Sequence, residues 1–162
     1  MAMKNETSID NLQQALAMEL TAAHQYLLHA HVLDDWGLDK LASRMRDEMQ
    51  EELGHAGKFI ERIMFLGGTP NLTPAATPSK AESLRALFES DRKDEGEAIR
   101  FYTESARAAS DNDDIGTRRL FEDIVLDEEG HWDWLNRQID LLERMGEPAF
   151  YNTYMSGDQA GA

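Results

Sequence analysis

Four long segments of this chain repeat apolar residues in steps of three and four, the spacing that lines one face of an α-helix. They cover about residues 8–36, 39–66, 80–110 and 114–145. A helix of about 28 residues is about 42 Å long. No segment alternates polar and apolar residues for long enough to predict a strand. The pattern therefore predicts an all-α protein built as one four-helix bundle.

The inward-facing residues of each predicted helix are apolar at both ends and polar in the middle. We expect these polar centres to lie at similar depth in the bundle. The ionisable residues of the four centres are Glu19, Glu48, Glu52, His55, Asp91, Glu95, Glu128 and His131.

The first half of the chain resembles the second when the sequence is shifted by 76 residues without a gap. Most residues differ, and those that match lie mainly in the polar centres. Two similar helical hairpins packed face to face would have a pseudo-two-fold axis, with one Glu and one Glu-x-x-His from each hairpin near it. The matched pairs include Glu19 with Glu95, Tyr26 with Tyr102, Glu52 with Glu128, and His55 with His131.

Four carboxylates in a buried centre cannot all be ionised and unpaired, because desolvation costs several kcal/mol per ion and their mutual repulsion adds to it. Either most of them are protonated or cations lie between them. Two divalent metals would balance four carboxylates, and two neutral imidazoles would complete the ligand set. A single Glu-x-x-His arises often by chance, and such residues could lie on a solvated face. Two copies on apolar stripes favour a di-metal site.

The segment "GGTPNLTPAATPSK", residues 67–80, holds three of the four prolines and is too long for a tight turn. It predicts a crossover between the second and third helices. Ser79 and Glu82 have the spacing of a capping box, which places the next helix start near residue 80. The segment "EPAFYNTYM", residues 147–155, predicts a short final helix. A chain of 162 residues fits one domain, residues 1–162.

The formal charge is −15, from 31 acidic and 16 basic residues, and there are no cysteines. The absence of cysteine excludes disulfides, zinc ribbons and cysteine-ligated iron, and it suits a cytoplasmic protein. The acidity argues against nucleic-acid and anionic-membrane partners, although part of it is solvated helix surface. No apolar run has the length of a membrane span.

The sequence resembles the bacterioferritin family over nearly its whole length, in "MELTAAHQYLLHAHVLDDWGL", "KFIERIMFLGGTPNL" and "DEEGHWDWLNRQIDLLERMG". The resemblance implies a ferritin-like bundle with a long crossover and a short C-terminal helix. It also implies a homo-oligomeric shell of about two dozen subunits, 24 in the family pattern, or a shell mixed with a haem-binding subunit type.

The same resemblance implies a role for each polar residue. The terminal ligands would be Glu19 and His55 on one iron, and Glu95 and His131 on the other. The bridging ligands would be Glu52 and Glu128. The residues that would hydrogen-bond to the ligands and orient them are Tyr26, Asp91 and Tyr102. The tyrosines could equally be amphipathic core residues.

Bacterioferritins usually bind haem through a methionine inside the first Glu-x-x-His, and that position is Leu53 in this chain. An aliphatic side chain cannot ligate iron. Met49, one turn earlier, is a possible substitute, but a helical methionine more often packs in a core. We therefore expect two irons per subunit and no haem.

The predicted function is iron storage by a ferroxidase, which oxidises Fe²⁺ to Fe³⁺ with O₂ or H₂O₂ and stores the mineral in the shell. Two alternatives stay open: a di-iron or di-manganese peroxidase or oxidase, and a DNA-protecting mini-ferritin. His24, His29 and His31 lie off the inward face and are expected at the surface or at subunit contacts. Asp47 and Glu51 either hold iron in transit or form a solvated acidic face.

Overall fold

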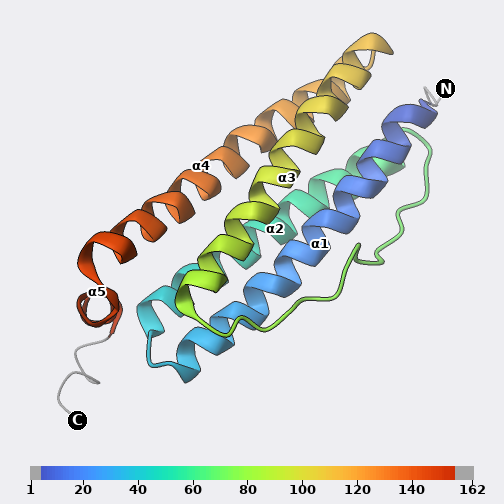
Figure 1. The fold of residues 1–162 in the computed structure, drawn as a ribbon. Helices are drawn as coiled ribbons and strands as arrows, with labels where there is room; N and C mark the ends of the chain where they lie inside the picture. Colours follow the sequence, from blue (N-terminus) through green and yellow to red (C-terminus); the bar gives the residue numbers. More distant parts are fainter. Residues whose placement is uncertain (1–4, 156–162) are drawn as a thin grey trace.

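The computed structural model describes residues 5–155, and residues 1–4 and 156–162 of the predicted domain lie outside this range. Five helices and no strand occur in the described part of the chain (Figure 1). The helices are α1 (Glu6–Asp35), α2 (Asp39–Phe65), α3 (Leu84–Asp111), α4 (Ile115–Met145) and α5 (Glu147–Tyr154).

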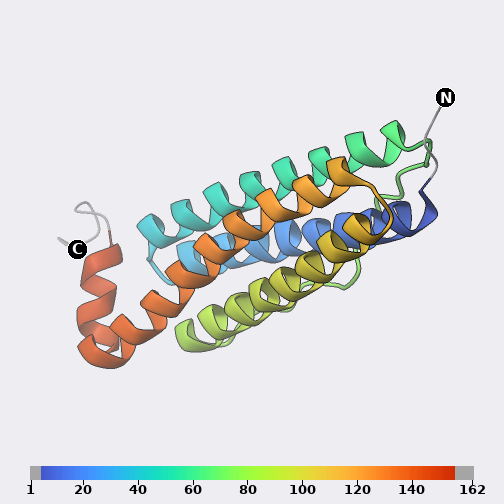
Figure 2. The ribbon, with the colours of Figure 1, turned by 90° about the horizontal axis from the view of Figure 1, so that it is seen from above.

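Two antiparallel hairpins, α1 with α2 and α3 with α4, lie side by side and form the bundle (Figures 1 and 2). The crossover between α2 and α3, residues 66–83, runs along α1 from one end of the bundle to the other. It lets α3 begin at the opposite end from the last turn of α2. The short α5 lies across the end of the bundle where α1 turns into α2 (Figure 2).

Glycines end the two helices of the first hairpin. Gly37 and Gly67 have φ values of 82° and 81°, in the left-handed region that favours glycine. The amide of Leu38 then donates to the carbonyl of Leu33 (2.9 Å), and that of Gly68 donates to the carbonyl of Ile63 (2.9 Å). These bonds satisfy carbonyls that the helix ends would leave free, so the hairpin turn and the start of the crossover are set locally.

The apolar core has two parts, one toward each end of the bundle. One contains Leu33, Leu41 and Phe88, and the other contains Leu16 and Phe59, all of them fully buried. The polar centres of the helices lie between these parts. Burial of the two apolar ends stabilises the bundle, while the middle is left available for polar groups.

The prediction that α3 begins near residue 80 is wrong. The helix begins at Leu84, and its N-cap is Ser83, whose Oγ accepts a hydrogen bond from the amide of Ala86 (3.1 Å). Ser79 cannot start the helix because the side chain of Gln25 on α1 binds both its amide and its carbonyl. A tertiary contact therefore overrides the capping-box pattern.

No helix in residues 5–155 is both long enough and apolar enough to span a membrane.

Candidate metal centre

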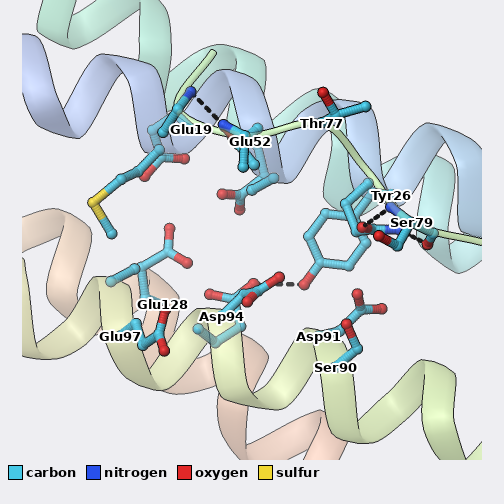
Figure 3. Close-up of a pocket in the computed structure, with 18 of the residues that line it drawn as sticks. Glu19, Tyr26, Glu52, Thr77, Ser79, Ser90, Asp91, Asp94, Glu97 and Glu128 are labelled. Atoms are coloured by element: carbon cyan, nitrogen blue, oxygen red, sulfur yellow. Dashed lines mark hydrogen bonds between the residues drawn. The ribbon is translucent and has the colours of Figure 1, made fainter.

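Six ionisable side chains from four helices meet in the middle of the bundle. Figure 3 shows the carboxylates of Glu19, Glu52 and Glu128 pointing toward one another. Each of the six is at most 5% exposed. They are the residues that the internal repeat singles out: Glu19 from α1, Glu52 and His55 from α2, Glu95 from α3, and Glu128 and His131 from α4.

The six side chains form two overlapping groups that share Glu52 and Glu128. Within each group, one potential ligand atom per residue lies within 4.8 Å of all the others. The first group adds Glu19 and His55, and the second adds Glu95 and His131. Two neighbouring metal positions with two shared carboxylates fit this geometry.

Several ligating atoms in the centre are buried and lack a hydrogen bond. They include Glu52 Oε1, both carboxylate oxygens of Glu128, and Nδ1 of both His55 and His131. His55 Nδ1 lies 2.9 Å from Glu128 Oε1, and His131 Nδ1 lies 3.2 Å from Glu52 Oε1, but neither contact has hydrogen-bond geometry. Buried polar atoms are rarely left unpaired. Oxygen and imidazole donors that converge in this way fit two metal ions such as iron.

The carboxyl groups differ in their preference for protons. Burial raises the pKa of Glu52 well above its usual range, and the charges of Glu19 and Glu128 raise it further. Burial and the charge of Glu128 also raise the pKa of Glu95. Burial alone would raise the pKa of Glu128, but contacts with Glu95 and the two histidines lower it. Without metal, protons on some carboxyls relieve the repulsion between them.

The surrounding carboxylates raise the pKa values of both histidines. Burial opposes the charged form of His55, but the carboxylates of Glu128 and Glu19 outweigh it and raise the pKa to about 10. Burial also opposes the charged form of His131, whereas Glu128 and Glu48 raise its pKa. A metal-free centre thus uses imidazolium protons to balance the carboxylates, and two divalent ions would replace that charge.

An acidic residue directly precedes each Glu-x-x-His, and its carboxylate contacts the histidine of the other hairpin. Asp127 Oδ2 lies 3.0 Å from Nε2 of His55, and Glu51 Oε2 lies 3.0 Å from Nε2 of His131. The two acids are 76 residues apart, so they are equivalent in the repeat. The repeat therefore marks both acids, but only the folded structure shows that each contacts a histidine of the other hairpin. Carboxylates at the outer nitrogen fix the orientation of a ligand histidine.

Glu48 is a further residue whose contact the sequence did not reveal. Its Oε2 lies 2.8 Å from His131 Nε2, and its Oε1 accepts a hydrogen bond from Nε of Arg44 (2.6 Å). The histidine contact and Arg44 lower the pKa of Glu48 against the opposing effect of burial. The residue has no acidic equivalent in the second hairpin, where the position is Ile124.

Each of the two tyrosines also donates a hydrogen bond to a glutamate of the other hairpin. Tyr26 on α1 donates to Glu95 Oε1 on α3 (2.5 Å), and Tyr102 on α3 donates to Glu19 Oε1 on α1. Each tyrosine therefore leaves the second oxygen of its carboxylate for another partner. Burial raises the pKa of both hydroxyls, so they act as donors.

Asp91 and His29 depart from expectation. The resemblance implied that Asp91 orients a ligand carboxylate, but its hydrogen-bond partner is His29, whose Nδ1 lies 3.0 Å away. The expectation that His29 lies at the surface is wrong, because its side chain is fully buried. It lies off the inward face of α1, and its two ring nitrogens contact Gln25 on α1 and Asp91 on α3. His24 and His31 are exposed.

Comparison with known proteins shows the family of this chain. A family model described as a ferritin-like domain matches residues 9–145. A bacterioferritin from Rhodobacter capsulatus is 42% identical over 142 residues, which cover 88% of each chain. The chain belongs to the bacterioferritin family. Another bacterioferritin, from Brucella melitensis biotype 1, is 40% identical over 149 residues, covering 91% of this chain and 92% of that protein.

The fold of this bacterioferritin matches solved structures as well. A Rhodobacter capsulatus bacterioferritin superimposes with a TM-score of 0.92 at 39% identity, covering 95% of this chain and 97% of that chain. That structure was solved with a metal-free dinuclear site and haem iron in a crystallographic special position. The predicted family and ferritin-like bundle are confirmed. Iron storage is the function that the comparisons support for this chain.

Proposed function

We propose that this chain is a ferroxidase, which binds two Fe²⁺ ions per subunit and oxidises them for storage. The observation that carries the proposal is the convergence of six buried side chains with ligating atoms, five of which have at least one such atom without a hydrogen bond. Four carboxylates balance two divalent ions, and imidazole nitrogen adds affinity for Fe²⁺.

The overlap of the two groups supports a specific ligand assignment. Glu52 and Glu128 belong to both groups, so they would bridge the two ions. The terminal ligands would be Glu19 and His55 on one ion, and Glu95 and His131 on the other. Asp127 and Glu51 would hold the imidazole rings in position from their outer nitrogens.

The proposed reaction moves two electrons. Two Fe²⁺ ions become two Fe³⁺ ions while O₂ takes up two electrons and two protons to form H₂O₂. With H₂O₂ as oxidant, the same two electrons and two protons produce two water molecules. The protein contributes position and charge balance, because its carboxylate oxygens are hard donors that favour the ferric state.

The proposed assembly is a homo-oligomeric shell, and 24 subunits, a mixed shell and a cytoplasmic location stay predictions. We also propose that haem is not bound by the usual route. Leu53 has no ligating atom, and its side chain is 42% exposed on α2. Met49 packs against the apolar core near α5. The chain offers all six ligands itself, whereas mini-ferritins place their sites between subunits.

Substitution of Glu128 tests the ferroxidase. Glu128→Gln keeps the volume of the side chain and removes a bridging charge. We expect the initial rate of Fe²⁺ oxidation to fall by at least about 100-fold, because loss of residues that only orient ligands already costs 10–100-fold. The measurement is stopped-flow absorbance of Fe³⁺ formation, with circular dichroism to show that the helices are retained.

The matched control is Glu129→Gln, which removes the neighbouring exposed carboxylate. It is expected to oxidise iron at the unchanged rate. A Glu128→Gln protein that oxidises iron as fast as this control would contradict the proposed site. Prolonged loading separates the alternatives, since a storage protein takes up many irons per subunit and a peroxidase or oxidase holds two.

A further inference from the structure

A cavity of about 350 Å³ leads from the metal centre to the surface between α1 and α3. Its floor includes Glu19, Glu52 and Glu128, which are buried and carry oxygens without hydrogen bonds. Asp94 and Glu97 of α3 lie on its exposed rim (Figure 3). The volume is large enough for several water molecules.

The opposite rim is formed by residues 75–79 of the crossover, which we call the strap. The strap has no helix or strand of its own and is held by side chains of α1. Thr21 Oγ1 accepts hydrogen bonds from the amides of Ala75 (2.9 Å) and Ala76 (3.2 Å). Gln25, one turn further on, binds Ser79 twice: its Nε2 donates to the carbonyl (2.9 Å) and its Oε1 accepts from the amide (3.0 Å).

His29 links Gln25 to Asp91 on α3, the helix that forms the other rim. Its Nε2 lies 2.9 Å from Gln25 Nε2, and its Nδ1 lies 3.0 Å from Asp91 Oδ2 on α3. The amide of Ser79 must donate to Gln25 Oε1, so Gln25 Nε2 faces His29 and donates to it. His29 Nε2 is therefore the acceptor, and its proton lies on Nδ1, where it is donated to Asp91. The contact between Ser79 and Gln25 is reciprocal, and from Gln25 the hydrogen bonds run in one direction, through His29 to Asp91.

We propose that Gln25 and His29 are positioning residues for iron oxidation, which set the width of this cavity by tying the strap to α3. Gln25, His29 and Asp91 are at most 8% exposed, so water competes poorly for these bonds. Asp91 lies one helical turn before Asp94 and Glu95, so this series of hydrogen bonds ends at the α3 side of the opening. The inference rests on the proposed ferroxidase, because it concerns access to that site.

The chain provides its own matched control at the far end of the crossover. Gln13, three turns before Gln25 on α1, binds Asn71 in the same reciprocal way, at 2.6 Å and 2.9 Å. Neither Gln13 nor Asn71 lines the cavity. Loss of the Gln13 pair therefore removes the same two hydrogen bonds to the crossover without reaching the opening, whereas loss of Gln25 also removes its bond with His29.

The test measures Co²⁺ binding to the metal-free assembled protein, with the visible absorption of the bound ion as the signal. In Gln25→Met, which keeps the side-chain length, we expect Co²⁺ to enter and leave about tenfold faster, because two hydrogen bonds that hold the strap are lost. The dissociation constant should stay within about twofold, since no ligand changes. Hydrogen exchange at Ser79 should accelerate in parallel.

Three further variants complete the design. Gln13→Met should accelerate exchange at Asn71 alone and leave the Co²⁺ rates unchanged. His29→Leu removes the hydrogen bonds to Gln25 and Asp91, and it should behave like Gln25→Met. His29→Gln can donate to Asp91 and accept from Gln25, so it should restore the slow rates. This rescue would not occur if His29 served only to fill space.

The proposal is overturned if Gln25→Met and Gln13→Met have the same Co²⁺ rates, or if Gln25→Met changes only one of the two rates and so shifts the dissociation constant by more than about twofold. The dependence of Co²⁺ binding on Glu128 tests the proposed ferroxidase site separately. If Co²⁺ binding did not depend on Glu128, the metal site would be wrong, whatever the rates of the strap variants.

Discussion

His55 and His131 each face carboxylates with both of their ring nitrogens. The inner nitrogen points to the shared carboxylates, and the outer nitrogen of His55 meets Asp127 while that of His131 meets Glu51 and Glu48. The hydrogen bond with Asp127 therefore sets the orientation of the His55 ring before a metal binds, whereas Glu48 and Glu51 approach His131 Nε2 without hydrogen-bond geometry. A ring that is already oriented would bind metal without first reordering.

The pKa values predict that metal binding releases protons. His55, with a pKa raised to about 10, is protonated at pH 7, and the raised pKa values of His131, Glu52 and Glu95 favour their protonated forms. Metal ligands must be deprotonated, so metal affinity should increase as the pH rises toward these pKa values. We expect about two to four protons per subunit to leave when two Zn²⁺ ions bind.

The measurement is a Zn²⁺ titration in weak buffer at pH 7 with a pH indicator, repeated as affinity measurements between pH 6 and 8. Zn²⁺ excludes redox chemistry from the signal. Glu128→Gln should reduce both the binding and the proton release. Affinity that does not change with pH, with no protons released, would contradict the protonation described here.

The convergence of the six side chains was predictable because each has an identical equivalent in the other half of the repeat, on faces that are apolar at both ends. Asp127 and Glu51 are marked by the same repeat, but both lie toward the solvent side of their helices, where acidic residues are common. The burial of His29 was not predictable from helix periodicity. The partner on α3 is Asp91, 62 residues further along the chain, and the pattern of one helix does not contain such a contact.

At the scale of the elements, the crossover is the segment whose conformation depends most on contacts with residues distant in the sequence. Helices α1 and α2 end where glycine signals place their ends, because a left-handed residue and two backbone bonds suffice. The start of α3 depends instead on the contact between Ser79 and Gln25, which are 54 residues apart. Local patterns therefore predicted the helices and their number, but not the first turn of α3.

A pair of serine substitutions tests the cap of α3. Ser83→Ala removes the side chain that accepts from the amide of Ala86, and it should destabilise the protein by about 1 kcal/mol. Ser79→Ala should cost less than about 0.5 kcal/mol, because Gln25 binds only the backbone of Ser79. Thermal unfolding at one fixed protein concentration gives both values. A larger loss for Ser79→Ala would restore the capping box predicted from sequence.

At the scale of the molecule, the two hairpins act as equivalent halves of one site. Each hairpin supplies a tyrosine and an acidic residue that contact a glutamate and a histidine of the other hairpin. Neither hairpin can complete the centre alone, which accounts for the repeat persisting in the polar middle while the apolar ends diverge. An apolar end tolerates many volume-conserving changes, whereas a ligand does not.

The assembled protein provides the test at this scale. A shell of 24 chains of 18.4 kDa has a mass of about 440 kDa. We expect that mass, many irons per subunit after loading, and no Soret absorption of haem, because Leu53 cannot ligate iron. Mass spectrometry of the intact assembly, metal analysis and visible absorption give the three values. Stoichiometric haem, or loading that stops at two irons, would contradict the storage shell proposed here.

The most direct test of the central claim is the position of iron in a crystal of the protein loaded with Fe²⁺ without oxygen. Anomalous diffraction at the iron edge should show two peaks per subunit between the six side chains, about 3.5–4 Å apart. One peak should lie against His55 and the other against His131, with Glu52 and Glu128 between them. A single peak, or none in the bundle with iron only at the surface, would contradict the di-iron centre.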